Sequence, residues 1–215
     1  MQRKLWLWAF LVWLPLACSP SPRSPEMYPR PKTVAVLPFE AACPGGETGY
    51  FACPVRSIIK GEIAPGAAEF MDALLRERLA GKPAFRFVSR DELETLLEKV
   101  LVETVSPSRN EILKALGRAL GTEAILYGKV FRFRERKGRS YAVREPASVA
   151  FALVLFRSKD GRILWKGWFD ETQRPLSENL FKIKLYGGVK WLTARQLAEK
   201  GLERVLSDFP YPGGE

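Results

Sequence analysis

The sequence predicts a single mixed α/β domain, in which helices pack on a sheet of about five strands in the order β-α-β-α-α-β-β-β-α. Two observations predict this class. Up to Gly121, amphipathic segments with leucines at helical spacing alternate with short apolar runs. After Gly121, the apolar residues fall in longer strand-like runs joined by turns, which is typical of an antiparallel meander. At 215 residues and 47% hydrophobic content, the chain supplies one core of moderate size.

The first half of the domain is expected to alternate strands with helices. Ser89 and Ser108 are each followed three residues later by a glutamate and then by leucines, which is the pattern of a capping box at the start of a helix. Gly81 and Gly121 follow amphipathic stretches and mark their ends. The expected elements are a strand at 33–39, a helix at 65–81, a strand at 85–88, and helices beginning at Ser89 and at Ser108.

The second half is expected to be a meander closed by a helix. Strand-like runs at 124–133, 147–156 and 163–169 should pair in order, with a short turn from Arg136 to Pro146 between the first two. After an irregular or partly helical stretch at 173–190, apolar residues at helical intervals predict a last helix within 191–209.

The first 18 residues have the layout of an export signal. A basic start precedes the apolar run Leu5–Ala17, which is short for a membrane span because such a helix needs about 20 residues. We expect residues 1–17 to be removed as a signal peptide. Leu16-Ala17-Cys18 is similar to the lipobox of bacterial lipoproteins, in which the cysteine receives acyl chains such as palmitate, although Pro15 departs from the usual apolar residue. The alternative is ordinary secretory cleavage, with Cys18 left as a free thiol.

Residues 18–32 are expected to form the lipidated cysteine and a tether. Five prolines within the 14 residues from Ser19 to Lys32 predict an extended segment, which at about 3.1 Å per residue reaches roughly 40 Å. Ser19 differs from the aspartate that retains many lipoproteins at the inner membrane. The resemblance therefore favours the outer membrane, with residues 33–215 as a periplasmic domain.

Cys43 and Cys53 are the other two cysteines, and they flank a glycine-containing segment. In an oxidising periplasm we expect them to form a disulfide, and on the chain-entropy estimate this 11-residue ring adds about 2–3 kcal/mol of stability. A metal or redox pair is the rival interpretation. The spacing is not Cys-x-x-Cys and the chain has no histidine, so too few soft ligands are available for zinc.

The composition excludes several kinds of chemistry. Because histidine is absent, the sequence excludes catalysis by a serine or cysteine with a histidine base. Carboxylates such as Glu69, Asp72, Asp91 and Asp170 lie beside lysine or arginine, where capping and solvation explain them. We therefore predict no enzyme activity, no cofactor and no metal. A net charge of +10 favours anionic partners, but export from the cytoplasm argues against nucleic acid.

Four short motifs are distinctive: VAVLPF at 34–39, LLRERL at 74–79, FRFVSR at 85–90 and LGTEAILYGKV at 120–130. Together with the lipobox and the tether, they resemble bacterial envelope lipoproteins of the CsgG-like group. That group is itself similar to the TolB amino-terminal domain and to the lipoprotein activators of penicillin-binding proteins. The resemblance covers about 33–130 and implies a similar α/β fold in the cell envelope.

Two groups of residues are candidates for binding. Tyr50 and Phe51 lie in the loop between the paired cysteines, where aromatic side chains serve either as contact anchors or as packing. A basic cluster surrounds the expected turn at 136–146, and it is either a solvated hairpin or a docking patch for an anionic partner. Its members are Arg132, Arg134, Arg136, Lys137, Arg139 and Arg144. Trp165 and Trp168 should point to opposite faces of a strand, which makes one of them a candidate interface residue.

The sequence thus predicts a non-enzymatic outer-membrane lipoprotein. Its periplasmic domain would act as an adaptor or assembly factor in envelope biogenesis or export, with an envelope protein partner or as a homo-oligomer. The alternative is a stand-alone module that binds anionic envelope polymers, such as peptidoglycan, lipopolysaccharide or acidic polysaccharide, through the arginine-rich hairpin.

Overall fold

The computed structural model describes residues 30–42, 58–103, 106–139, 142–173 and 191–210. They form a mixed α/β domain around one six-stranded sheet, which confirms the predicted fold class. Five strands follow the order β3-β1-β4-β7-β8, and β2 pairs separately with β4. The strands are β1 (Val34–Val36), β2 (Glu40–Ala41), β3 (Phe85–Phe87), β4 (Ala124–Arg134), β7 (Ser148–Arg157) and β8 (Ile163–Thr172).

The helices begin and end close to where capping residues and glycines predict. In α3, the Ser108 hydroxyl accepts a hydrogen bond from the Glu111 amide, and the Glu111 carboxylate accepts one from the Ser108 amide. These two bonds confirm the capping box predicted at Ser108. The box predicted at Ser89 is only half formed, because the carboxylate of Glu92 binds Arg86 instead. The helices are α1 (Ala67–Leu79), α2 (Arg90–Glu103), α3 (Arg109–Leu120) and α5 (Ala194–Ser207).

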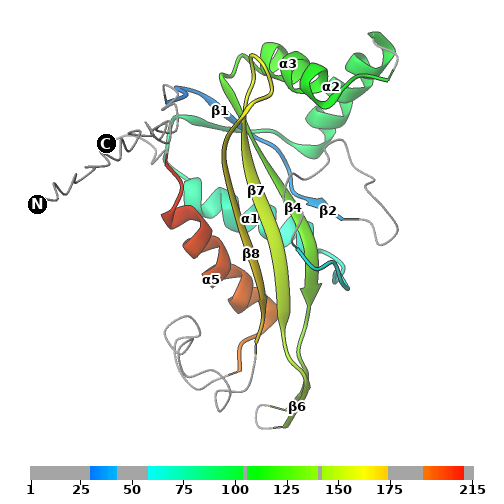
Figure 1. The fold of residues 1–215 in the computed structure, drawn as a ribbon, viewed down its shortest axis with the longest axis vertical. Coiled ribbons are helices and arrows are strands. Elements are labelled where there is room, and N and C mark those ends of the chain that lie inside the picture. The colour runs from blue at the N-terminus through cyan, green and yellow to red at the C-terminus, as the bar shows by residue number, and fades with distance from the viewer. Residues whose placement is uncertain (1–29, 43–57, 104–105, 140–141, 174–190, 211–215) are drawn as a thin grey trace, which may run out of the picture.

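The sheet is parallel on one side and antiparallel on the other. β1 pairs in parallel with β3 and with β4, because helical crossovers connect these strands. β4, β7 and β8 form the predicted antiparallel meander. The expected short turn at 136–146 is wrong: β5 (Lys137–Arg139) and β6 (Ala142–Glu145) extend the β4–β7 hairpin as a second ladder. Figure 1 shows this extension projecting beyond the helices.

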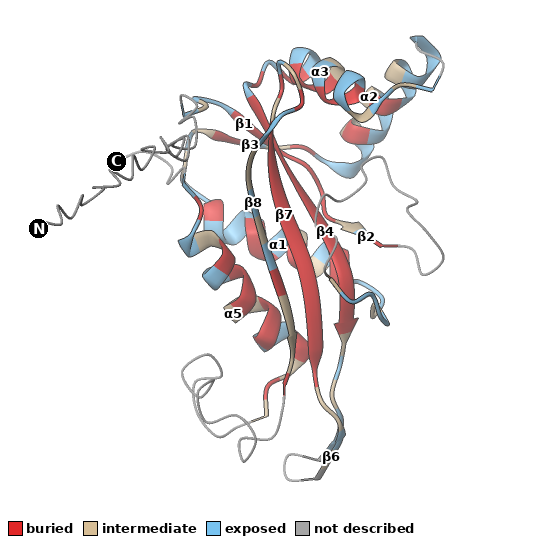
Figure 2. Ribbon diagram, viewed as in Figure 1, coloured by how far each residue is buried: buried red, intermediate tan, exposed pale blue. Residues whose placement is uncertain are grey.

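Helices cover the two faces of the sheet unequally. One core lies between the sheet and α1 and α5, and it includes Phe39, Met71, Phe151 and Leu202. A second core, under α2 and α3, covers the other face near the start of β4. Farther along that face, a small cluster contains Phe131, Ala150 and Ala152, with Ile58 and Ile63 packed against it. Figure 2 shows that β4 and β7, between these layers, are buried along nearly their whole length.

The sequence after β2 continues along the outer edge of β4. β2 pairs with Lys129 and Val130, and the chain then returns at 61–64, where Gly61 donates its amide to Phe131 and Ala64 donates its amide to Phe133. The edge of β4 is thereby covered by backbone from three successive segments of the chain. The segment at 58–64 also crosses the face of the sheet that the helices leave open, and this crossing positions the site described next.

Candidate binding surface

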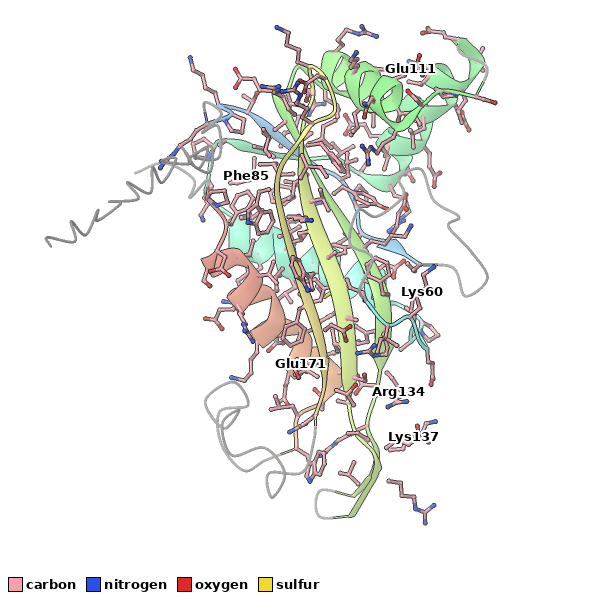
Figure 3. The ribbon with its side chains drawn as sticks, viewed as in Figure 1. Lys60, Phe85, Glu111, Arg134, Lys137 and Glu171 are labelled. Atoms are coloured by element: carbon pink, nitrogen blue, oxygen red, sulfur yellow. The ribbon has the colours of Figure 1, made fainter. Side chains whose placement is uncertain are left out.

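The basic cluster predicted around the hairpin is divided by the structure into three environments. Arg132 is buried, Arg134 faces a groove, and Arg136, Lys137 and Arg144 lie on the β5–β6 extension. Arg139 pairs with Ala142 in that extension, and its side chain lies outside the described residues. Figure 3 shows Arg134 and Lys137 in succession toward the end of the hairpin, with Lys60 on the neighbouring segment.

Arg132 forms a closed network across three strands. In the sheet register, Arg132 of β4 and Asp170 of β8 both pair with Ala150 of β7, so the two charged residues lie two strands apart. The small Ala150 side chain leaves room for the guanidinium to cross β7 and reach the Asp170 carboxylate at 2.5 Å. Its Nε donates to the Ser148 hydroxyl, which in turn contacts the Thr172 hydroxyl at 2.6 Å.

The same arginine fastens the segment at 58–64 to the sheet. Arg132 Nη1 donates to the Ile59 carbonyl at 2.6 Å, and the Ile59 amide donates to Asp170. Gly61 lies directly over the arginine, because a Cβ at that position would be 2.7 Å from Arg132 Cδ. Arg132 is only 8% exposed, so the structure differs from the expectation of an exposed patch at this residue. The arginine holds three parts of the domain together.

Beside this network lies a polar groove of about 740 Å³. Arg134 and Lys60 bring positive charge to it, and Glu62 and Glu171 bring negative charge. The Nε of Arg134 is buried and has no hydrogen-bond partner among the described residues. The groove therefore presents both signs of charge, which suits a partner with its own mixed polar surface better than a uniformly anionic one.

The β5–β6 extension carries charges that are partly neutralised. Lys137 and Glu145 form an exposed ion pair at 3.3 Å, and Arg136 Nη1 donates to the Trp191 carbonyl at 3.3 Å. Arg144 is exposed and makes no ion pair within the described part of the chain. Exposed pairs of this kind contribute little to stability, typically below about 1 kcal/mol.

The strand β8 is the edge of the sheet and displays apolar side chains. Within the described residues it pairs only with β7. As predicted for residues three apart, Trp165 and Trp168 differ in environment: Trp165 packs edge-to-face on Phe209, whereas Trp168 is 51% exposed. A long edge strand with an exposed tryptophan offers backbone hydrogen-bonding groups and an aromatic anchor to a partner.

The sequence reasoning missed the environment of Asp72 on α1. Its Oδ1 accepts a hydrogen bond from the Phe39 amide at 2.5 Å, and its Oδ2 lies 3.4 Å from Arg90 Nη2. Asp72 therefore links α1 to the segment that follows β1 and to the start of α2. Burial raises the pKa of Asp72 to about 6, against the smaller opposing effects of the Phe39 amide and Arg90. The sequence suggested that Asp72 and Asp170 are simply solvated carboxylates. In the structure, both are instead bound to groups of the protein.

Several predicted sites fall outside the described residues. These are the lipidation site Cys18, the pair Cys43 and Cys53, and the aromatic pair Tyr50 and Phe51. Their proposed roles stay predictions. In the described part of the chain, no group of three or more histidine, cysteine or acidic residues is placed to hold a metal ion.

None of the helices within the described ranges combines the length and the apolar composition that a bilayer crossing requires.

No protein-family model and no curated protein matches the sequence. Solved structures do match. The PelC dodecamer from Paraburkholderia phytofirmans is 14% identical, with 84% of this chain and 89% of that chain covered and a TM-score of 0.46. Lipoprotein GNA1162 from Neisseria meningitidis is 15% identical, with 73% of this chain and 97% of that chain covered and a TM-score of 0.41. The LpoB C-terminal domain from Escherichia coli is 17% identical, with 68% of this chain and 87% of that chain covered and a TM-score of 0.38. The resemblance to the CsgG-like and TolB-like groups stays a prediction.

Proposed function

We propose that the protein is a lipid-anchored, non-enzymatic adaptor of the bacterial envelope, held at the outer membrane and facing the periplasm. The observation that carries the proposal is the order of segments at the amino terminus. An export signal, a lipobox-like cysteine and a proline-rich tether lead directly into β1, which begins at Val34. Such a chain would hold a folded domain within reach of envelope proteins while leaving the domain free to turn.

The adaptor surface in this proposal is the exposed edge of β8 together with the adjoining mixed-charge groove. Trp168 would supply the aromatic anchor, and the edge of β8, which pairs only with β7 in the described part of the chain, would pair with a strand of the partner. The buried Arg132 network supports the proposal because it fixes β8 and the segment at 58–64 to the hairpin, so both sides of the groove are rigid before a partner binds.

Site-specific cross-linking in envelope preparations tests this function. A photoreactive amino acid in place of Trp168 should give one discrete cross-linked product, either with a second envelope protein or with a second copy of the chain. Val102 on α2 is the matched control, because it is also apolar and is 87% exposed. Equal cross-linking from both positions, or none from Trp168, would contradict the adaptor surface.

The alternative function is binding of an anionic envelope polymer through the hairpin. It is favoured by Arg134, Arg136 and Arg144, which make no ion pair within the described residues. In that case the protein stays monomeric and is retained on peptidoglycan or acidic glycan in a salt-sensitive way. Arg134→Gln with Arg144→Gln would abolish that retention, whereas the adaptor interpretation predicts that the cross-link at Trp168 survives the double change.

A further inference from the structure

A second, more strongly basic cavity lies at the opposite end of the long strands from the hairpin extension. It has a volume of about 840 Å³ and lies among the end of α3, the turn between β7 and β8, and residues 30–32. Figure 1 shows α3 and this turn together at the upper end of the domain. The cavity shares no lining residue with the groove beside Arg132.

The local backbone brings two residues with hydroxyl side chains to the wall of this cavity. α3 ends at Gly121, whose left-handed φ of 66° turns the chain so that the Thr122 amide donates back to Gly117. The end of β7 approaches closely, since a Cβ on Gly117 would be 2.3 Å from Ser158 Cβ. Only glycine at position 117 allows this approach. Thr122 and Ser158, from separate elements, therefore line the same cavity.

Both hydroxyls are buried without a hydrogen-bond partner. Thr122 is 8% exposed and Ser158 is 7% exposed, and neither side-chain oxygen has a partner among the described residues. Buried hydroxyl groups in folded proteins are nearly always paired, so each unpaired one calls for an explanation. Both residues line one cavity, and rotation about the Cα–Cβ bond would turn each hydroxyl toward a ligand that supplies the missing acceptor.

The charge of the cavity indicates what kind of acceptor that is. Its lining has one acidic residue, Glu123, against six basic ones. Arg157 is bound to Asp160, but Lys114, Arg118 and Lys159 make no ion pair within the described ranges. Lys114 and Arg118 are one helical turn apart, where like charges repel. The basic residues are Arg30, Lys32, Lys114, Arg118, Arg157 and Lys159.

We propose that this cavity, here called the tether-end pocket, binds an organic phosphate, with the phosphoryl oxygens between the Thr122 and Ser158 hydroxyls and the Lys114 and Arg118 side chains. A phosphate accepts several hydrogen bonds at once and carries the charge that these cations complement. A cavity of about 840 Å³ is far larger than a bare phosphate needs. Pro31 and Leu164 in its lining offer apolar surface to the rest of the ligand.

The phosphate could be carried by a soluble molecule or by a phospholipid headgroup, and the experiment separates the two sources. The purified full chain is titrated by calorimetry with glycerol 3-phosphate, and binding to vesicles of phosphatidylglycerol is compared with binding to vesicles of phosphatidylcholine. Each titration is repeated with Thr122→Val, with Ser158→Ala and with the double variant Lys114→Gln/Arg118→Gln. The matched control is Arg78→Gln/Lys99→Gln, which removes the same charge from exposed positions on α1 and α2 that line neither the cavity nor the groove.

We expect saturable binding that Thr122→Val and Ser158→Ala each weaken about tenfold, because each removes one hydrogen bond to a charged group. The Lys114→Gln/Arg118→Gln variant should bind more weakly still, and the control variant should bind as the original chain does. Binding of glycerol 3-phosphate identifies a soluble ligand, and binding only to phosphatidylglycerol vesicles identifies a lipid headgroup; either result supports the pocket. No saturable binding to either probe, or an equal loss in the control variant, would overturn the proposal. Neither result depends on where the adaptor surface lies.

Discussion

The two basic regions at opposite ends of the long strands differ in how their charges are satisfied. In the region around Arg132, the guanidinium contacts a carboxylate, a hydroxyl and a backbone carbonyl, all within the domain. In the tether-end pocket, Lys114, Arg118 and Lys159 have no ion-pair partner in the described part of the chain, and two buried hydroxyls are unpaired. Similar residue types therefore have different roles. The residues around Arg132 stabilise the fold, and those of the tether-end pocket are available to a ligand.

The largest change in the free energy of unfolding is expected from Arg132→Ala, and it distinguishes the two regions. This change leaves the Asp170 carboxylate partly buried without its cation and frees the segment at 58–64. Breaking a buried pair by removing one partner costs about 3 to 5 kcal/mol, so the free energy of unfolding in urea should fall by that amount. Arg144→Ala, on the exposed extension, is the control and should change it by less than about 0.5 kcal/mol. Equal losses from the two changes would remove the distinction between buried and exposed arginines.

An intermediate effect on the free energy of unfolding is expected at Asp72. This residue extends the comparison to a carboxylate whose charged form is disfavoured by burial. Its folded pKa of about 6 lies above the ordinary value of 3.8. The folded state therefore holds the proton more tightly than the unfolded state, and stability is greatest below about pH 4 and declines as the pH rises to about 6. The loss over this window should be about 2 to 3 kcal/mol.

Asp72→Asn isolates that effect because the amide oxygen can still accept the Phe39 amide while the titrating proton is gone. Denaturant unfolding of both proteins from pH 4 to pH 8 should show similar stability at pH 4 and a more stable variant at pH 8. If the difference between the two proteins does not change with pH, burial does not raise the pKa of this carboxylate.

The smallest effect is expected in the tether-end pocket without ligand. Lys114→Gln/Arg118→Gln removes two neighbouring like charges that have no ion-pair partner in the described residues, so the free energy of unfolding should change by less than about 0.5 kcal/mol. The same measurement on Arg132→Ala serves as the reference. A loss above about 2 kcal/mol in the double variant would show that these cations stabilise the fold, and the contrast between the two regions would disappear.

The sequence predicts the elements far better than it predicts which charges meet. The capping box at Ser108 and the stop at Gly121 are local signals, and α3 begins and ends where they indicate. The β5–β6 ladder was missed because its charged residues show no apolar alternation. The partnership of Arg132 with Asp170 depends on the register of β4, β7 and β8 and on an irregularity between Val130 and Arg132. No sequence spacing reveals such a register.

The tether-end pocket was hidden for the same reason. Thr122 and Ser158 are far apart in the chain, and neither lies in a recognisable phosphate-binding motif. They line the same cavity because Gly117 lets the end of β7 approach α3 closely. Two lone hydroxyl residues after a helix and a strand carry no signal by themselves. The one usable hint in the sequence was the i, i+4 pair of cations at Lys114 and Arg118, on a helix whose only acidic residue is Glu111.

The central claim, that the chain is exported and anchored through lipid, is tested most directly by the intact mass of the protein isolated from its native host. The account predicts a species that begins at Cys18 and carries acyl chains on it, with Cys43 and Cys53 joined by a disulfide. A species that retains Met1, or a processed chain with an unmodified thiol at Cys18, would contradict it.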